Sequence, residues 1–95
     1  MLKQKGTNMQ NLKNALQNFV VLLQQQVTAE NAHAHMQACL RAASVIEEIA
    51  DAQYAGDVTD EEHNVLQKAV YAVDELCSKH YSIAVQCAQE AIALI

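Results

Sequence analysis

The feature that most constrains the fold is the near absence of helix-breaking residues. The chain of 95 residues has no proline, and its two glycines are Gly6 and Gly56. In the segments 7–55 and 57–95, apolar residues recur at spacings of three and four. Because this is the period of one face of an α-helix, the sequence predicts an all-α fold.

The length indicates one small domain over residues 1–95. Residues 1–7 precede the first periodic segment, and we expect them to form a flexible tail. A first helix is expected from Met9, and a second helix from Thr28 to about Ala55. Short connections favour antiparallel neighbours, so the expected architecture is a small antiparallel bundle of three to four helices.

The clearest local signals lie between the second and third helices. Gly56 follows the last periodic residue, where a glycine in the left-handed conformation commonly ends a helix. The sequence Thr59-Asp60-Glu61-Glu62 predicts a capping box. In this motif the threonine hydroxyl and the glutamate carboxylate each accept a hydrogen bond from the backbone N–H of the other residue. The third helix is therefore expected to begin here.

The apolar stripe of the C-terminal segment continues to the end of the chain, and two arrangements fit it. One is a single helix of about 35 residues, which would be about 50 Å long. The other breaks near Ser78-Lys79-His80, where Ser78 would cap a fourth helix. A single long helix would extend beyond its partners, so we favour four helices.

The core of the bundle is expected to come from one stripe on each helix. Sixteen residues are alanine, which buries little surface but allows helix axes to approach closely. The larger residues of the expected core are Leu12, Leu16, Phe19, Leu23, Met36, Leu40, Ile46, Ile49, Leu66, Val70, Val73 and Leu76.

The charge of the chain is acidic and unevenly distributed. The formal net charge is −5, and no acidic residue precedes Glu30. Because no basic patch is present to neutralise phosphates, we expect neither nucleic acid nor an anionic membrane surface as a partner. A cluster of acidic residues instead suggests a basic protein partner. The residues of this cluster are Glu47, Glu48, Asp51, Asp57, Asp60, Glu61 and Glu62.

Cysteine usage and hydropathy bear on the cellular compartment. Cys39, Cys77 and Cys87 are an odd number of cysteines at wide spacing, which does not fit a disulfide framework. The longest apolar runs have five residues, as at 19–23, and are too short for a signal sequence or a membrane span. We therefore expect a cytoplasmic protein.

Cysteine and histidine residues form the best metal-like pattern in the chain. His35 and Cys39 are four residues apart, and Cys77 and His80 are three apart, so each pair shares a helix face. Two facing helices could combine these pairs into a zinc site. Both cysteines also fall on the core stripes, where a free cysteine behaves as a small apolar residue. We therefore expect no metal and no cofactor.

The sequence also lacks the motifs of common enzymes. It has no glycine-rich phosphate loop, nucleophile elbow or dinucleotide fingerprint. We therefore expect a non-enzymatic protein-interaction module, such as a small acidic adaptor, inhibitor or regulator of bacterial or phage origin. The alternative is a bundle that binds a metal or a small ligand through its cysteine and histidine residues.

The first helix carries the expected apolar interface. Between Phe19 and Leu23 it is apolar nearly all round, which is typical of a helix covered on several sides. We expect Phe19, Leu22 and Leu23 to be the apolar anchors, because interface energy concentrates in a few buried side chains. The same surface favours a homo-oligomer, with a dimer as the simplest form.

Overall fold

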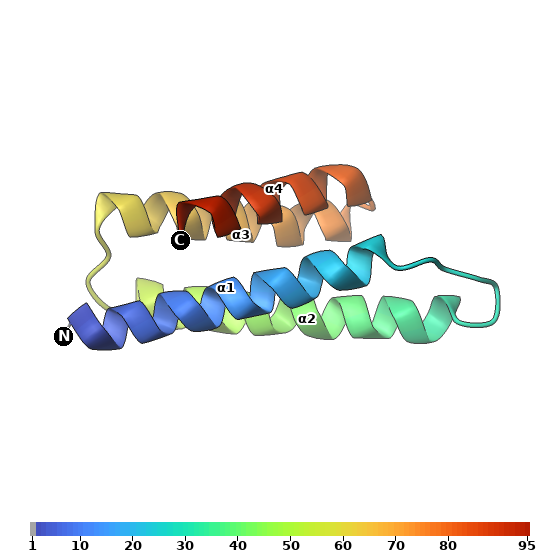
Figure 1. Ribbon diagram of the computed structural model, residues 1–95, viewed down its shortest axis with the longest axis horizontal. Coiled ribbons are helices and arrows are strands. Elements are labelled where there is room, and N and C mark those ends of the chain that lie inside the picture. The colour runs from blue at the N-terminus through green and yellow to red at the C-terminus, as the bar shows by residue number, and fades with distance from the viewer. Residues whose placement is uncertain (1) are drawn as a thin grey trace.

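The protein forms a bundle of four α-helices (Figure 1). In the computed structural model, the backbone is described for residues 2–95 and the side chains from Met9 onward. The helices are α1 (Leu2–Gln24), α2 (Ala32–Tyr54), α3 (Asp60–Cys77) and α4 (Tyr81–Leu94). The predicted all-α antiparallel bundle is confirmed, and of the two predicted arrangements it is the one with four helices.

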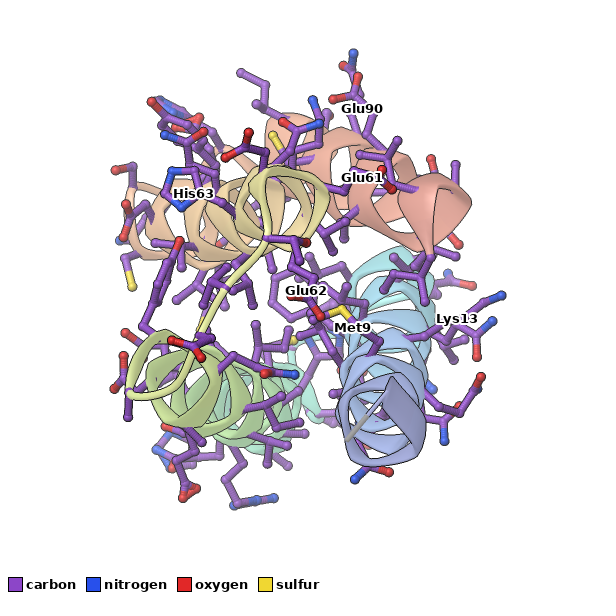
Figure 2. All side chains as sticks on the ribbon, turned by 90° about the vertical axis from the view of Figure 1, so that its left-hand side faces the viewer. Met9, Lys13, Glu61, Glu62, His63 and Glu90 are labelled. Carbon is purple, nitrogen blue, oxygen red and sulfur yellow. The ribbon has the colours of Figure 1, made fainter. Side chains whose placement is uncertain are left out.

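Each helix runs antiparallel to the one before it along the long axis of the molecule (Figure 1). Seen from one end, the helices occupy the corners of a square (Figure 2). Helix α1 packs against α2 and α4, and α3 packs against α2 and α4. The two hairpins differ in length, because α1 and α2 have 23 residues each whereas α3 has 18 and α4 has 14.

The start of α3 is the predicted capping box. The Thr59 Oγ1 atom accepts a hydrogen bond from the Glu62 backbone N–H at 3.1 Å. The Glu62 Oε1 atom accepts one from the Thr59 backbone N–H at 3.0 Å. Two N–H groups at the end of the helix are therefore satisfied by local side chains, as the sequence indicated.

The start of α1 differs from the prediction. The helix begins at Leu2 and continues through Gly6, so neither a start at Met9 nor a tail over residues 1–7 is correct; Met1 lies outside the described residues. Leucine, lysine and glutamine have high helix propensity, and one glycine costs only about 1 kcal/mol in a helix. The helix therefore extends beyond the periodic apolar segment from which the prediction was made.

The start of α2 lies one turn later than the predicted Thr28. Thr28 and Asn31 close a separate turn, in which the Thr28 N–H donates to Asn31 Oδ1 at 2.8 Å. The Asn31 N–H donates in return to Thr28 Oγ1 at 3.3 Å. Helix α2 then begins at Ala32. The threonine hydroxyl does cap one backbone N–H, that of Asn31, but this bond belongs to the turn that precedes the helix.

The end of α2 does not use the left-handed glycine that we predicted. No glycine among the described residues has a positive φ. The Gly56 N–H donates to the Gln53 carbonyl at 3.1 Å, and Ala55 keeps a right-handed conformation with φ −71° and ψ −17°. An i→i+3 bond thus satisfies the last turn, and no left-handed residue is needed.

The left-handed residue lies instead at the break between α3 and α4. Lys79 has φ 67° and is the one non-glycine residue with positive φ in the described chain. Its N–H donates to the Leu76 carbonyl at 2.9 Å, and the His80 N–H donates to the Glu75 carbonyl at 2.8 Å. This pair of bonds is a Schellman motif. Ser78 is therefore the C-cap of α3, and the prediction that it caps α4 is wrong, because the N-cap of α4 is His80.

The core combines a few large side chains with many alanines. Leu40, predicted to be in the core, is 42% exposed. It is not among the residues that pack against the core cluster. Leu23, Met36, Ile49 and Val70 are half-buried. The buried apolar residues are Leu12, Leu16, Phe19, Val20, Cys39, Ala42, Ala43, Ile46, Ala50, Val65, Leu66, Ala69, Ala72, Val73, Leu76, Ala84, Ala88 and Ala91.

The left-handed backbone at Lys79 predicts a stabilising substitution. A residue with a Cβ is disfavoured by about 1 kcal/mol in this conformation, whereas glycine is not. We expect Lys79→Gly to raise the free energy of unfolding by about 1 kcal/mol in urea denaturation. The control is Lys79→Ala, which removes the charge but keeps the Cβ. An equal gain from both variants would show that charge, and not backbone conformation, is the cause.

The buried amide of Gln53 predicts a second stabilising substitution. Its side chain is 6% exposed, and its Nε2 atom has no hydrogen-bond partner among the described residues. An unsatisfied buried donor costs about 1–3 kcal/mol, so we expect Gln53→Met to raise the free energy of unfolding by about 1 kcal/mol. The exposed Gln67→Met variant is the control, with a change below about 0.5 kcal/mol. A destabilised Gln53→Met protein would contradict the prediction.

Candidate functional site

The two ends of the bundle differ in charge. Residues 14–29 contain no Asp, Glu, Lys or Arg, and residues 80–89 contain none. These segments include the C-terminal half of α1 and the N-terminal half of α4, two helices that pack against each other. Together, residues 14–24 of α1 and 81–89 of α4 form what we call the uncharged face.

The uncharged face exposes several large apolar side chains. Val21 is 57% exposed, Ile83 is 46% exposed and Tyr81 is 40% exposed. The side chains around them are mainly Gln, Asn and Ser. Depletion of charge around exposed apolar and aromatic residues is typical of the centre of a protein–protein interface. A solvated surface would carry more Lys and Glu.

The predicted apolar anchors on α1 have different positions. Phe19 is 0% exposed and belongs to the core, so the prediction that it contacts a partner is wrong. It occupies the same stripe as Leu12 and Leu16, which accounts for its burial. Leu22 and Leu23 are half-buried at the edge of the core. Leu23 also lines a depression between α1 and α4 with Tyr81 and two other residues of α4.

A cavity of about 360 Å³ opens at the same end of the bundle. The α1–α2 hairpin extends past the turn between α3 and α4 at this end (Figure 1), so the core is not closed there by a fourth helix. The lining residues are Leu23, Val27, Ala32, His35, Met36, Cys39 and Tyr81. Of these, the sequence singled out His35 and Cys39, as metal candidates, and Leu23, as an interface residue. The predicted break before α4 was the signal that could have revealed Tyr81, the first residue of that helix.

His35 connects the two helices that wall this cavity. Its Nε2–H donates a hydrogen bond to the Leu22 carbonyl in the last turn of α1, which also accepts one from the Gln25 N–H at 3.3 Å. The Cys39 Sγ atom lies 3.8 Å from the same imidazole ring. Burial raises the pKa of the Cys39 thiol, so this cysteine is protonated at neutral pH. The arrangement fits a structural histidine and an inert thiol.

The four metal candidates do not come together. His35 and Cys39 form one pair on α2. Cys77 is exposed at the end of α3, and the His80 Nδ1 atom lies 3.3 Å from Glu75 Oε1. Among the residues with described side chains, no group of three His, Cys, Asp or Glu residues could hold a metal ion.

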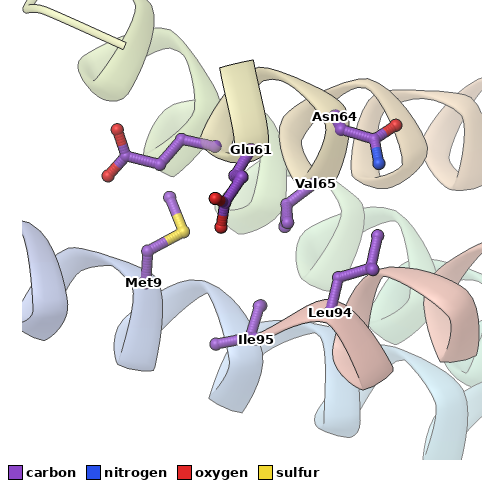
Figure 3. A pocket seen from close by; sticks show the side chains of 7 residues that line it. Met9, Glu61, Asn64, Val65, Leu94 and Ile95 are labelled. Carbon is purple, nitrogen blue, oxygen red and sulfur yellow. The ribbon is translucent and has the colours of Figure 1, made fainter. Parts of the chain in front are cut away.

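The predicted acidic residues lie at the opposite end of the bundle, on the second half of α2, the loop 55–59 and the first turn of α3. All are exposed except Glu62, which is half-buried and belongs to the capping box. Glu61 and Glu62 also line a cavity of about 260 Å³. Its apolar walls come from Met9, Val65 and the end of α4 (Figure 3).

No protein-family model matches the chain, and neither a curated protein nor a solved structure matches it. None of the helices in the described part of the chain is both long and apolar enough to span a membrane.

The different environments of the three thiols predict their order of reaction. Cys77 is exposed, Cys87 is half-buried and Cys39 is buried. Burial raises the pKa of both Cys39 and Cys87, and nearby Glu90 and Glu75 raise that of Cys87 further. We expect iodoacetamide to alkylate Cys77 at least about tenfold faster than Cys39, as measured by peptide mass spectrometry at pH 8. Equal rates at Cys39 and Cys77 would contradict the assigned burial.

Proposed function

We propose that the protein is a non-enzymatic protein-interaction module that pairs with a second copy of itself through the uncharged face. The observation that carries this proposal is the charge-free stretch of α1, residues 14–24, beside the charge-free stretch of α4, residues 81–89. Both stretches are solvent-exposed on their outer sides and include Val21 and Ile83.

The net charge favours this face over the rest of the surface. A chain of net charge −5 repels its own copy wherever acidic residues oppose each other. A symmetric dimer places the same patch on both subunits, so a patch of one sign opposes a patch of the same sign. The uncharged face avoids this repulsion, and its Gln and Asn side chains can donate and accept hydrogen bonds across a two-fold axis.

The alternative is a basic protein bound at the acidic end of the bundle. Six exposed carboxylates between Glu47 and Glu61 would favour such a partner. The two modes differ in their response to salt. Pairing through the uncharged face is expected to change little between about 50 and 500 mM salt, whereas binding through the acidic end would weaken strongly.

A matched pair of valine substitutions tests the proposal. Val21 on the uncharged face and Val45 on α2 are both exposed helical valines, at 57% and 46%. In a symmetric dimer, Val21→Asp places two carboxylates near each other, so we expect the dissociation constant to rise at least about tenfold. Val45→Asp should leave pairing unchanged. Sedimentation equilibrium over a wide range of protein concentration measures both, and circular dichroism melts confirm that both variants fold.

A wild-type protein that stays monomeric at all concentrations would overturn self-pairing. An equal loss of pairing in both variants would place the interface elsewhere. A dimer that dissociates at high salt, and whose dissociation constant is unchanged by Val21→Asp, would favour an interface at the acidic end of the bundle.

A further inference from the structure

We infer that the open end of the core is a binding site for a small neutral compound of one or two rings. The site is the cavity between the end of α1, the start of α2 and the first residue of α4, with a volume of about 360 Å³. It shares Leu23 and Tyr81 with the uncharged face, but its other lining residues belong to the α1–α2 loop and to α2.

The lining determines the chemistry of the ligand. None of the lining residues is Asp, Glu, Lys or Arg, and most are aliphatic. A charged ligand would lose hydration in this cavity without gaining an ionic partner, which is strongly unfavourable. An apolar ring would instead displace water from Leu23, Val27 and Met36. Ligand sites in helical bundles commonly lie between helices and are mainly apolar in this way.

The volume sets the size of the ligand. An apolar cavity of about 150 Å³ is enough to bind benzene. The cavity here, at about 360 Å³, falls within the range of ligand sites and can accept a bicyclic compound. A longer or branched molecule would have to extend out of the open mouth.

The walls of the cavity are held in place by hydrogen bonds that do not involve a ligand. The bond from His35 to the Leu22 carbonyl joins α2 to the end of α1. The reciprocal bonds of Thr28 and Asn31 fix the loop beside it. In a preformed site of this kind, little conformational entropy is lost by the walls when a ligand binds.

Tyr81 supplies the polar group of the site. Its position follows from the Schellman motif at Lys79, which ends α3 and sets the first residue of α4. Tyr81 carries the one hydroxyl group among the lining residues and can offer it to a ligand, whereas the His35 Nε2–H is already used. A ring compound with a single N–H or O–H group therefore fits better than a pure hydrocarbon.

Indole is a suitable probe, because it is neutral, bicyclic and carries one N–H. We expect titration with indole to shift the methyl NMR signals of Leu23, Val27 and Met36. The methyl signals of Val65, Leu94 and Ile95, which line the cavity at the opposite end, should not shift. No shift at saturating indole, or equal shifts at both ends, would overturn the inference.

A matched pair of alanine substitutions tests the location. Ala32 and Ala34 are both exposed at the start of α2, but only Ala32 lines the cavity. We expect Ala32→Phe to fill the mouth and weaken indole binding at least about tenfold, and Ala34→Phe to leave it unchanged. Circular dichroism melts establish that both variants fold. Undiminished binding to a folded Ala32→Phe protein would exclude this cavity.

A tyrosine pair tests the polar contact. We expect Tyr81→Phe to weaken indole binding by about fivefold through loss of one hydrogen bond, while Tyr71→Phe has no effect. Unchanged affinity in a folded Tyr81→Phe protein would show that the Tyr81 hydroxyl does not contact the ligand, and would overturn the polar part of the inference. These measurements do not depend on dimerisation, because Val21→Asp should bind indole as the wild type does. Failure of either proposal is thus visible separately.

Discussion

The backbone at Lys79 is the constraint on which the rest of the structure depends. A left-handed residue at this point ends α3 at Cys77 and reverses the chain, so the C-terminal segment becomes two helices. The fourth corner of the bundle is filled only because of this reversal. The cost is a conformation that residues with a Cβ adopt reluctantly, which the two backbone hydrogen bonds of the Schellman motif offset. Local strain here is coupled to the global topology.

The sequence predicted the fold class and the start of α3 because the determinants are local. The Thr59–Glu62 box acts within a single turn, and helical periodicity needs no knowledge of neighbours. Other positions depended on tertiary context. Gly56 has the permissive backbone, yet Lys79 takes the left-handed conformation, because helix packing selects the reversal point. Leu40 has the right period, yet 42% of it is exposed, and periodicity alone does not define the edge of the buried face.

The candidate site was less predictable than the fold, for a physical reason. Phe19 lies in a segment of α1 that is apolar nearly all round, so the sequence alone does not show which face of the helix packs against the core. In the structure Phe19 is on the buried face. The cavity arises from a difference in hairpin length, which depends on where three helices end. His35 looked like a metal ligand by spacing, and its imidazole instead satisfies a carbonyl at the end of α1.

The helix pairs of the bundle are unequal, and this has a consequence for its motion. The contacts between α2 and α3 are the sparsest of the four neighbouring pairs, although these two helices are joined by the short loop 55–59. The molecule thus consists of two hairpins, α1–α2 and α3–α4, which contact each other more extensively between α1 and α4 than between α2 and α3. Sub-global opening follows the weakest boundary between cooperative units. The boundary between α2 and α3 is therefore expected to open before the boundary between α1 and α4, so that each hairpin stays intact while water first reaches the core between α2 and α3.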